Sequence, residues 1–337
     1  MVVLLAVNNF MRFMIKKIIV PIIIFIFAAG GVYYWFQAQK IESVVISTVS
    51  SAAEGLIAHI VKGEGIDIKN KLNITYKPML PGDTERSLRN RDVEIGTHGV
   101  LVLAKANLEG KELRAIAPVY YNVYSLLVLK DSPYQTIEDL IGKKLAVQPK
   151  ISAAFTGPQT ALYLKGISLD KDFQLSFGNA SEAGKFLDQR EVDAAFFFEP
   201  IASKKIATGK YREILEVQKL WRESTGKTFP YLVFAAYEDW LQTHQSIAKK
   251  YRKSYLEAAN LIVKNPDILD KYKGFIKENL GIETDEEFKV LKQRFPKTLV
   301  TEWNQGVIND MKYILEKTVE FGILSEIPKK EIILELK

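Results

Sequence analysis

The sequence contains no cysteine, and this absence excludes several classes of site. Without a thiol there is no disulfide, thiolate zinc site, cysteine-ligated iron–sulfur cluster or cysteine nucleophile. Histidine is scarce as well. The three histidines, His59, His98 and His244, lie too far apart in the sequence to form a ligand pair at metal-site spacing. We therefore expect no metal centre and no other cofactor.

The chain also lacks a strong excess of charge of one sign. It has 46 basic and 40 acidic residues, which give a net charge of +6. Half of that charge comes from residues 1–39, which contain Arg12, Lys16 and Lys17 and no acid. The remaining excess is too small and too scattered for a nucleic-acid-binding face. We expect no nucleic acid partner.

Motifs of catalysis are missing too. The sequence contains neither GxSxG nor HExxH, and no GxGxxG follows a predicted strand. Gly226-Lys227-Thr228 resembles the end of a phosphate loop, but Trp221 stands where that loop needs its first glycine. Acids such as Asp193 and Glu199 have no partner that the sequence can place beside them. These absences predict a protein that is not an enzyme.

The longest hydrophobic run lies near the N-terminus. Residues 18–36 are nineteen in number and carry no charge, and as a helix they would extend about 28 Å, enough to cross the hydrocarbon core of a membrane. The basic cluster precedes this run, and two tyrosines and a tryptophan end it. The positive flank predicts a cytoplasmic N-terminus, so everything after Lys40 should lie outside the cytoplasm. We interpret residues 1–40 as a signal anchor with one transmembrane helix at about 18–36.

A cleaved signal peptide is the alternative for this segment. The small residues Ala28, Ala29 and Gly30 could form a cleavage site. The length of the apolar run and the large aromatic residues after it favour an uncleaved anchor. Met11 or Met14 could equally be the true start of the chain.

After residue 43 short apolar runs alternate with amphipathic stretches, a pattern typical of an α/β fold with a largely parallel sheet. From Glu238 onward the spacing of apolar residues is almost wholly helical. The expected strands are Val44–Val49, Leu72–Lys77, Val93–Gly96, Arg114–Val119, Tyr124–Lys130, Lys144–Val147, Phe173–Phe177, Ala194–Phe198 and Tyr231–Ala236.

Two short extended stretches, near Tyr124 and near Phe229, join two αβ blocks. Two such crossings indicate that the middle block is inserted into the first. We expect lobe 1 to comprise residues 41–123 and 230–337 and lobe 2 to comprise residues 124–229. The cleft between two lobes is a common place for a small ligand.

Small hydroxyl residues recur where a strand is followed by a helix. Backbone N–H groups at a helix N-terminus carry partial positive charge and, with a hydroxyl, can hold an anionic oxygen. The same residues also serve as ordinary helix caps, so this pattern alone leaves both roles open. His98 and Tyr121 are similarly open, since each could face the cleft or belong to the core. The hydroxyl positions are Ser50, Ser51, Thr97 and Ser152, the last followed by Ala153 and Thr156.

Several short motifs resemble those of a known family. Residues 137–147, IEDLIGKKLAV, resemble the segment that begins the second lobe of binding proteins for nitrate, sulfonates, taurine and thiamine-pyrimidine precursors. Residues 191–200, EVDAAFFFEP, and residues 93–98, VEIGTH, resemble two further segments of these proteins in the same order. The resemblance covers roughly residues 44–260. It implies a two-lobed periplasmic-binding-protein type 2 fold with a cleft between the lobes.

The resemblance implies a substrate-binding protein that captures a small solute outside the cell and presents it to an ABC transporter permease. We expect a monomer whose lobes close over the solute. Glu199 would lie at the cleft edge, where an acid disfavours a bare anion and favours a ligand with an N–H donor or a cation. Carried over by position, the ligand-binding residues would be Ser50, Ser51, Thr97, His98, Tyr121, Ser152, Ala153 and Glu199.

Two other functions remain open. Enzymes on the same fold use this cleft for chemistry, but their pyrimidine-synthesising members carry a cysteine-rich motif that this chain lacks. A ligand-sensing ectodomain would have to signal through a membrane partner. The sequence leaves the ligand undetermined among nitrate, sulfonates, taurine, heterocycles and related molecules.

Overall fold

The computed structural model describes residues 17, 20, 40–80 and 82–335. The predicted membrane span at 18–36 falls outside the described residues, apart from Val20. Among the residues that are described, no helix combines the length and the apolar character needed to cross a membrane. The described residues from Ser43 onward form one unit, which is described below together with the start of its first strand.

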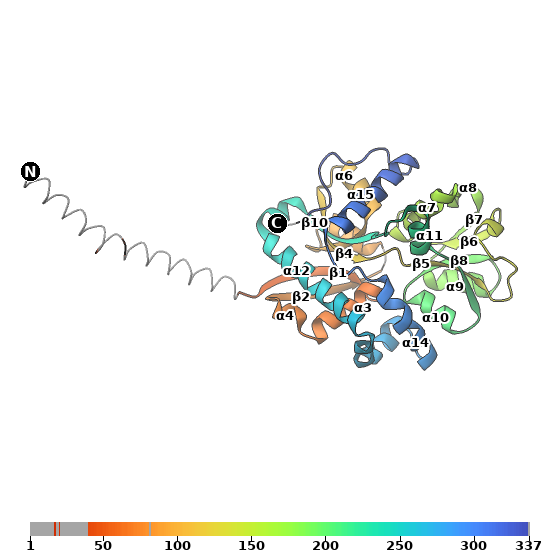
Figure 1. Cartoon of the computed structure of the whole chain (residues 1–337), viewed down its shortest axis with the longest axis horizontal. Helices are drawn as coiled ribbons and strands as arrows, with labels where there is room; N and C mark the ends of the chain where they lie inside the picture. The colour runs from red at the N-terminus through yellow and green to blue at the C-terminus, as the bar shows by residue number, and fades with distance from the viewer. Residues whose placement is uncertain (1–16, 18–19, 21–39, 81, 336–337) are drawn as a thin grey trace, which may run out of the picture. The chain divides into compact units, whose positions relative to one another are not determined.

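Lobe 1 contains a three-stranded sheet and a two-stranded sheet (Figure 1). β10 lies between β3 and β4 and runs antiparallel to both, while β1 pairs with β2. A parallel bridge between Ile46 and Ile95 joins β1 to the segment that leads into β3. The strands are β1 (Glu42–Val49), β2 (Leu72–Met79), β3 (Gly96–Gly99), β4 (Leu113–Tyr120) and β10 (Leu232–Tyr237), and the helices among them are α3 (Ala53–Gly63), α4 (Ile66–Lys69), α5 (Asp83–Arg89) and α6 (Val100–Leu108).

Lobe 2 contains a five-stranded sheet in the order β7-β6-β8-β5-β9 (Figure 1). β6 is parallel to β7 and β8, but β5 is antiparallel to β8 and β9. The strands are β5 (Tyr124–Leu129), β6 (Lys144–Val147), β7 (Gln174–Phe177), β8 (Ala194–Phe198) and β9 (Tyr211–Glu216), and the helices are α7 (Ala153–Leu162), α8 (Leu169–Asp172), α9 (Ala180–Asp188), α10 (Ile201–Ala207) and α11 (Val217–Thr225).

The C-terminal segment is helical, as the spacing of its apolar residues predicts. The long helix α12 packs against α3 and β4 of lobe 1, whereas α14 packs against α10 of lobe 2. The C-terminal segment therefore contacts both lobes. Its helices are α12 (Glu238–Lys264), α13 (Lys273–Phe275), α14 (Asp285–Arg294) and α15 (Gln305–Glu320), with 3-10 turns at Pro266–Tyr272 and Phe295–Thr298 and a π-helical turn at Ile276–Leu280.

Two crossings join the strands of the two lobes, while the exact division of the chain between the lobes stays a prediction. β4 leads into β5 through residues 121–123, and the second crossing runs from α11 through Phe229 into β10. The two crossings are hydrogen bonded to each other, because the Asn122 N–H donates to the Phe229 carbonyl at 2.8 Å. Tyr231 adds a link to lobe 2 through its hydroxyl, which donates to Thr156 Oγ1 at 2.6 Å.

The expectation of largely parallel sheets is confirmed only in part, since β6, β7 and β8 are parallel but the two strands that follow the crossings are not. The strands that follow the crossings, β5 and β10, each enter the middle of a sheet antiparallel to both neighbours. A strand that arrives from the other lobe enters the sheet from the edge where the other strands end, so it runs in the opposite direction. Glu138–Leu140, before β6, forms a 3-10 turn. The sequence interpretation also missed β9.

Candidate functional site

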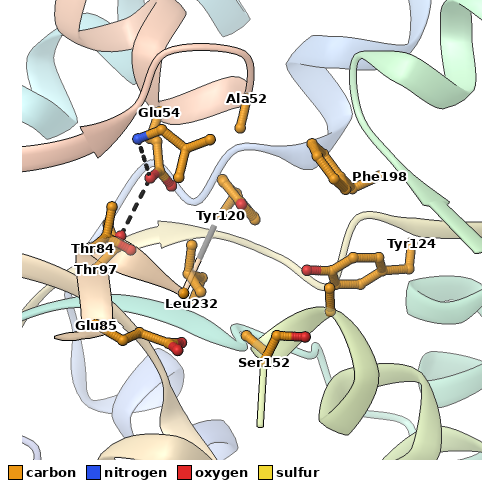
Figure 2. Close-up of a pocket in the computed structure, with 14 residues that line it drawn as sticks. Ala52, Glu54, Thr84, Glu85, Thr97, Tyr120, Tyr124, Ser152, Phe198 and Leu232 are labelled. Carbon is orange, nitrogen blue, oxygen red and sulfur yellow. Dashed lines mark hydrogen bonds between the residues drawn. The ribbon is translucent and has the colours of Figure 1, made fainter. Parts of the chain in front are cut away.

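A pocket lies where the two lobes meet (Figure 2). Lobe 1 contributes residues from the end of β1, the start of α3, α5, β3, the end of β4 and the start of β10. Lobe 2 contributes the start of β5, the start of α7 and the end of β8. The described residues that line the pocket are Val49, Ala52, Glu54, Gly82, Thr84, Glu85, Thr97, Tyr120, Tyr124, Ser152, Ala153, Ala154, Phe198 and Leu232.

The pocket is small. The space open to the centres of water molecules is about 40 Å³, which is room for about three waters. A solute of more than a few heavy atoms therefore needs the lobes to move apart. Gly99 marks one place where they touch, because a Cβ added there would lie 2.9 Å from the Cβ of Ala153 in lobe 2.

Glu54 is the most deeply buried acid of the pocket. Its side chain starts in the first turn of α3 and is 1% exposed. Its Oε1 accepts a hydrogen bond from the Val49 N–H at 2.8 Å and a longer one from Thr97 Oγ1 at 3.3 Å, and its Oε2 has no partner. Burial raises the pKa of Glu54 to about 7, although the hydrogen bonds from Val49 and Thr97 act against this shift.

Glu85 is the second acid, and it comes from α5. It is 8% exposed, and Figure 2 shows its carboxylate on the same side of the pocket as Glu54. Burial raises the pKa of Glu85 to about 7, the charge of Glu54 adds to this, and a backbone hydrogen bond from Gly99 and the charge of Arg89 oppose it. The two carboxyl groups therefore disfavour each other's ionisation.

Neutral hydroxyls and aromatic rings face the two acids. Tyr124, Ser152 and Phe198 lie across the pocket from Glu54 and Glu85 in Figure 2. Burial raises the pKa of Tyr120 and of Tyr124 far above the usual value, so both phenols stay neutral. Ser152 Oγ donates to the Pro149 carbonyl at 2.7 Å, which leaves its lone pairs as acceptors. The pocket can thus offer both hydrogen-bonding groups and flat apolar surfaces.

The structure brings together three of the residues that the sequence proposed. Thr97, Ser152 and Ala153 all line the pocket. Ser50 and Ser51 form the turn between β1 and α3, and both are half-buried beside lining residues without lining the pocket themselves. This turn lies directly on the helix backbone, because a Cβ at Gly55 would meet the Ser50 carbonyl oxygen at 2.5 Å.

His98 lies next to Thr97 but is not among the lining residues. It is fully buried, where β3 pairs with Val233 of β10, and neither ring nitrogen has a hydrogen-bond partner. Burial and, to a smaller extent, the positive charge of Arg89 lower the pKa of His98 to about 3. The ring is therefore neutral at physiological pH.

Tyr121 and Glu199 line a second, separate cavity behind the crossings. Glu199 is 3% exposed and both of its oxygens are occupied. Arg294 Nε of α14 donates to Oε1 at 2.7 Å, and the Ser203 N–H and hydroxyl donate to Oε2 at 3.1 and 2.6 Å. The acid that the sequence placed at the cleft edge is thus held inside an ion pair.

Arg294 extends this ion pair into a network. Its NH1 and NH2 groups donate to Glu213 at 3.1 and 2.8 Å, and NH2 also donates to Ser125 Oγ at 3.2 Å. Burial disfavours its charge, but the hydrogen bonds and charges of Glu213 and Glu199 outweigh burial and raise the pKa of Arg294. The network joins α14 to three strands of lobe 2 or their ends.

No group of three or more His, Asp or Glu side chains within the described ranges is arranged to hold a metal ion. The expectation that the protein needs no cofactor stays a prediction.

Comparison with models of known protein families identifies the family of this chain. The model of the family described as NMT1/THI5-like matches residues 48–268, about two thirds of the chain. The chain belongs to the NMT1/THI5-like family. The resemblance found in the sequence motifs is thereby confirmed. No curated protein matches this NMT1/THI5-like chain in sequence at a significant level.

Solved structures show the same fold at low sequence identity. The periplasmic aliphatic sulphonate-binding protein SsuA of Escherichia coli superimposes with a TM-score of 0.67 at 18% identity, over 85% of this chain and 95% of that one. The alkanesulfonate-binding protein SsuA of Xanthomonas axonopodis pv. citri, solved with bound MOPS, superimposes with a TM-score of 0.67 at 16% identity. This match covers 88% of this chain and 99% of that one. A Candida albicans protein with the generic periplasmic binding protein fold gives 0.63 at 12%, over 84% and 91%.

These superpositions confirm the two-lobed periplasmic-binding-protein fold of the NMT1/THI5-like chain. They span nearly the whole length of each solved protein. At identities of 18% and below, they establish the fold and leave the ligand to be argued from the pocket itself.

Glu54 and Glu85 are the pocket residues that sequence reasoning missed. Glu54 looks like an ordinary acid in the first turn of a helix, where a negative charge interacts favourably with the helix dipole. Glu85 lies in the charged run Asp83–Arg86, which looks like a solvated helix face. One signal was present for Glu54, since its helix is otherwise apolar from Ala52 to Ala58.

Proposed function

We propose that this protein is an extracytoplasmic solute-binding protein that captures a small molecule between its lobes and delivers it to an ABC permease. The observation that carries the proposal is the pocket at the junction of two lobes, lined by side chains from both. Because the lining comes from both lobes, a bound solute stabilises the closed arrangement, which a permease can distinguish from the open one. The names of the two SsuA structures, both sulfonate-binding proteins, support a transport role.

A ligand screen on the full chain in mild detergent tests this function. The screen compares thermal stability with nitrate, taurine, alkanesulfonates, small carboxylates, pyrimidines and organic amines. A solute at a hundred times its dissociation constant should add about 2.7 kcal/mol to the unfolding free energy. The same solute should reduce the radius of gyration in solution scattering, because it closes the lobes.

Matched serine variants locate the binding. Ser152→Leu fills part of the pocket and is expected to abolish the shift, since Ser152 is 6% exposed and lines the pocket. Ser181→Leu makes the same change on the exposed start of α9 and should leave the shift intact. A folded protein that responds to no solute, or a solute effect equal in both variants, contradicts the proposal.

We further propose that residues 18–36 remain attached as a membrane anchor, with the lobes on the extracytoplasmic side. The support is the nineteen-residue uncharged run after a basic cluster. The protein is expected in the membrane fraction after an alkaline carbonate wash, with its N-terminal peptide still present in mass spectrometry. Recovery of a soluble chain that begins near residue 31 would instead establish a cleaved signal peptide.

A further inference from the structure

The charges that line the pocket are of one sign. Its described lining residues include two carboxyl side chains, Glu54 and Glu85, and no lysine, arginine or histidine. The start of α7 also faces the pocket, and a helix N-terminus carries about half a positive charge. Glu54 lies in the first turn of α3, where its negative charge, when present, offsets the partial positive charge of that helix terminus. The carboxyl groups, once ionised, outweigh the helix termini, so above pH 7 the pocket is a poor site for a bare anion.

The unpartnered oxygen of Glu54 indicates what the pocket lacks. Oε1 is held by Val49 and Thr97, but Oε2 is buried without a hydrogen-bond partner. A buried carboxylate oxygen without a donor costs free energy, which a cationic N–H group from a ligand would recover. Figure 2 places this carboxyl group on the wall of the pocket, within a side chain that lines it.

The surroundings of the two acids contain little positive charge. Arg89 of α5 is the cation whose charge acts on Glu85, and it forms an ion pair with the exposed Glu109. His98 of β3 is neutral, and the phenols packed around the acids are neutral as well. The groups whose charges interact with Glu54 or Glu85 are each other, Arg89, Tyr120, Tyr124, Tyr231, Tyr251 and Tyr255.

Aromatic rings define the rest of the binding surface. Tyr120, Tyr124 and Phe198 all line the pocket, and Tyr124 and Phe198 pack edge to face with their centroids 6.2 Å apart. Ring faces attract cations through their quadrupoles and also cover flat apolar groups. This surface suits an organic cation with an apolar body better than it suits a hydrated metal ion.

We propose that the pocket binds a small organic molecule with a cationic nitrogen group, an ammonium or an amidinium, whose N–H groups donate to Glu54 and Glu85. Its apolar part lies against Tyr120, Tyr124 and Phe198. This inference rests on the proposed function as a solute-binding protein, and it separates this protein from the sulfonate-binding proteins whose fold it shares.

Charge-matched probes test the inference on the full chain. One set is acetamidinium, acetamide and methanesulfonate, and the larger set is benzamidinium, benzamide and benzenesulfonate. Calorimetric titration is expected to show binding of at least one amidinium, at least tenfold weaker binding of its amide, and no binding of the sulfonates. Glu54→Gln and Glu85→Gln should each weaken amidinium binding at least tenfold. Glu191→Gln, an exposed acid outside the pocket, should leave it unchanged.

The pH dependence gives a second readout. Both pocket acids have a pKa raised to about 7, so the requirement for one ionised carboxylate weakens amidinium binding about 30-fold between pH 8 and pH 5.5. An anion held by protonated carboxyl groups would show the opposite dependence. Tighter binding of a sulfonate than of its amidinium, or affinity that rises at low pH, overturns the inference and leaves the proposed function standing. A folded protein that binds neither these probes nor any solute of the wider screen contradicts both the inference and the proposed function.

Discussion

Replacing Glu54 by glutamine is expected to make the ligand-free protein more stable at pH 8. Burial raises the pKa of Glu54 from 4.5 to about 7, so the folded state holds a proton that the unfolded state releases. The stability that this bound proton contributes is fully present below pH 4.5 and is lost as pH rises through 7. Glutamine does not titrate, so Glu54→Gln should gain about 3 kcal/mol over wild type at pH 8 and less than about 1 kcal/mol at pH 5.

Urea unfolding of wild type and variant at pH 5, 6.5 and 8 measures this difference. Buried His98 destabilises the folded state below about pH 6.5, but it is present in both proteins and cancels. Glu85→Gln should behave like Glu54→Gln, since the pKa of Glu85 is also raised to about 7. Glu191→Gln is the exposed control and should change stability equally at all three pH values. A loss of stability at pH 8 in Glu54→Gln would mean that a cationic group already stabilises the carboxylate in the folded protein.

The same carboxyl groups would couple folding to solute binding. A solute that requires ionised acids stabilises the protein most at pH 8, where the ligand-free protein is least stable relative to its glutamine variants. As pH rises from 5 to 8, stabilisation by the solute is therefore expected to increase, while the stability of the ligand-free protein relative to its glutamine variants decreases. This is the cost of keeping two acids in a pocket with no built-in counter-charge, and it is typical of functional sites.

Replacing Arg294 by methionine is expected to destabilise the protein by about 3 to 5 kcal/mol. Arg294 is the cation that pairs with Glu199 and Glu213, and the Glu199 side chain is 3% exposed. Methionine keeps much of the side-chain volume but leaves Glu199 as a buried carboxylate whose remaining partner is Ser203. Thermal and urea unfolding of the ligand-free chain measure the loss.

An exposed pair supplies the control for this variant. Arg190 pairs with Asp131, and both side chains are more than 60% exposed, so Arg190→Met should cost less than about 1 kcal/mol. Adding Glu199→Gln to Arg294→Met should restore part of the stability, because it removes the unpaired charge. Equal losses in the two arginine variants, or no recovery in the double variant, would show that the buried ion pair is not what holds α14 against lobe 2.

Most strands were predictable because their apolar residues are buried on both faces. The runs Ala194–Phe198 and Leu113–Tyr120 are buried throughout, and such runs stand out in a sequence. β9 was missed because Tyr211–Glu216 is only partly buried and contains three charged residues. It is recognisable as a strand only through its pairing with β5.

The residues of the candidate site also divide into those that local sequence patterns predict and those that depend on distant partners. Thr97, Ser152 and Ala153 were predictable because a strand-to-helix turn places its residues at the carboxyl edge of a sheet, where α/β proteins bind ligands. Glu199 sits at such a turn too, yet it is removed from the pocket by Arg294, which lies 95 positions later in the chain. No local pattern contains that partner.

The sequence by itself determined most of the strands, the helical C-terminal segment and the hydrophobic N-terminal run, because burial and turn formation are recorded in local patterns of residues. Only the tertiary structure decided the direction of the strands after the crossings and the charge of the pocket. An acid on a helix has the same local sequence whether it faces water or a second lobe. What makes Glu54 and Glu85 a binding feature is the packing of distant segments over them, which removes water and leaves their charge without a counter-ion.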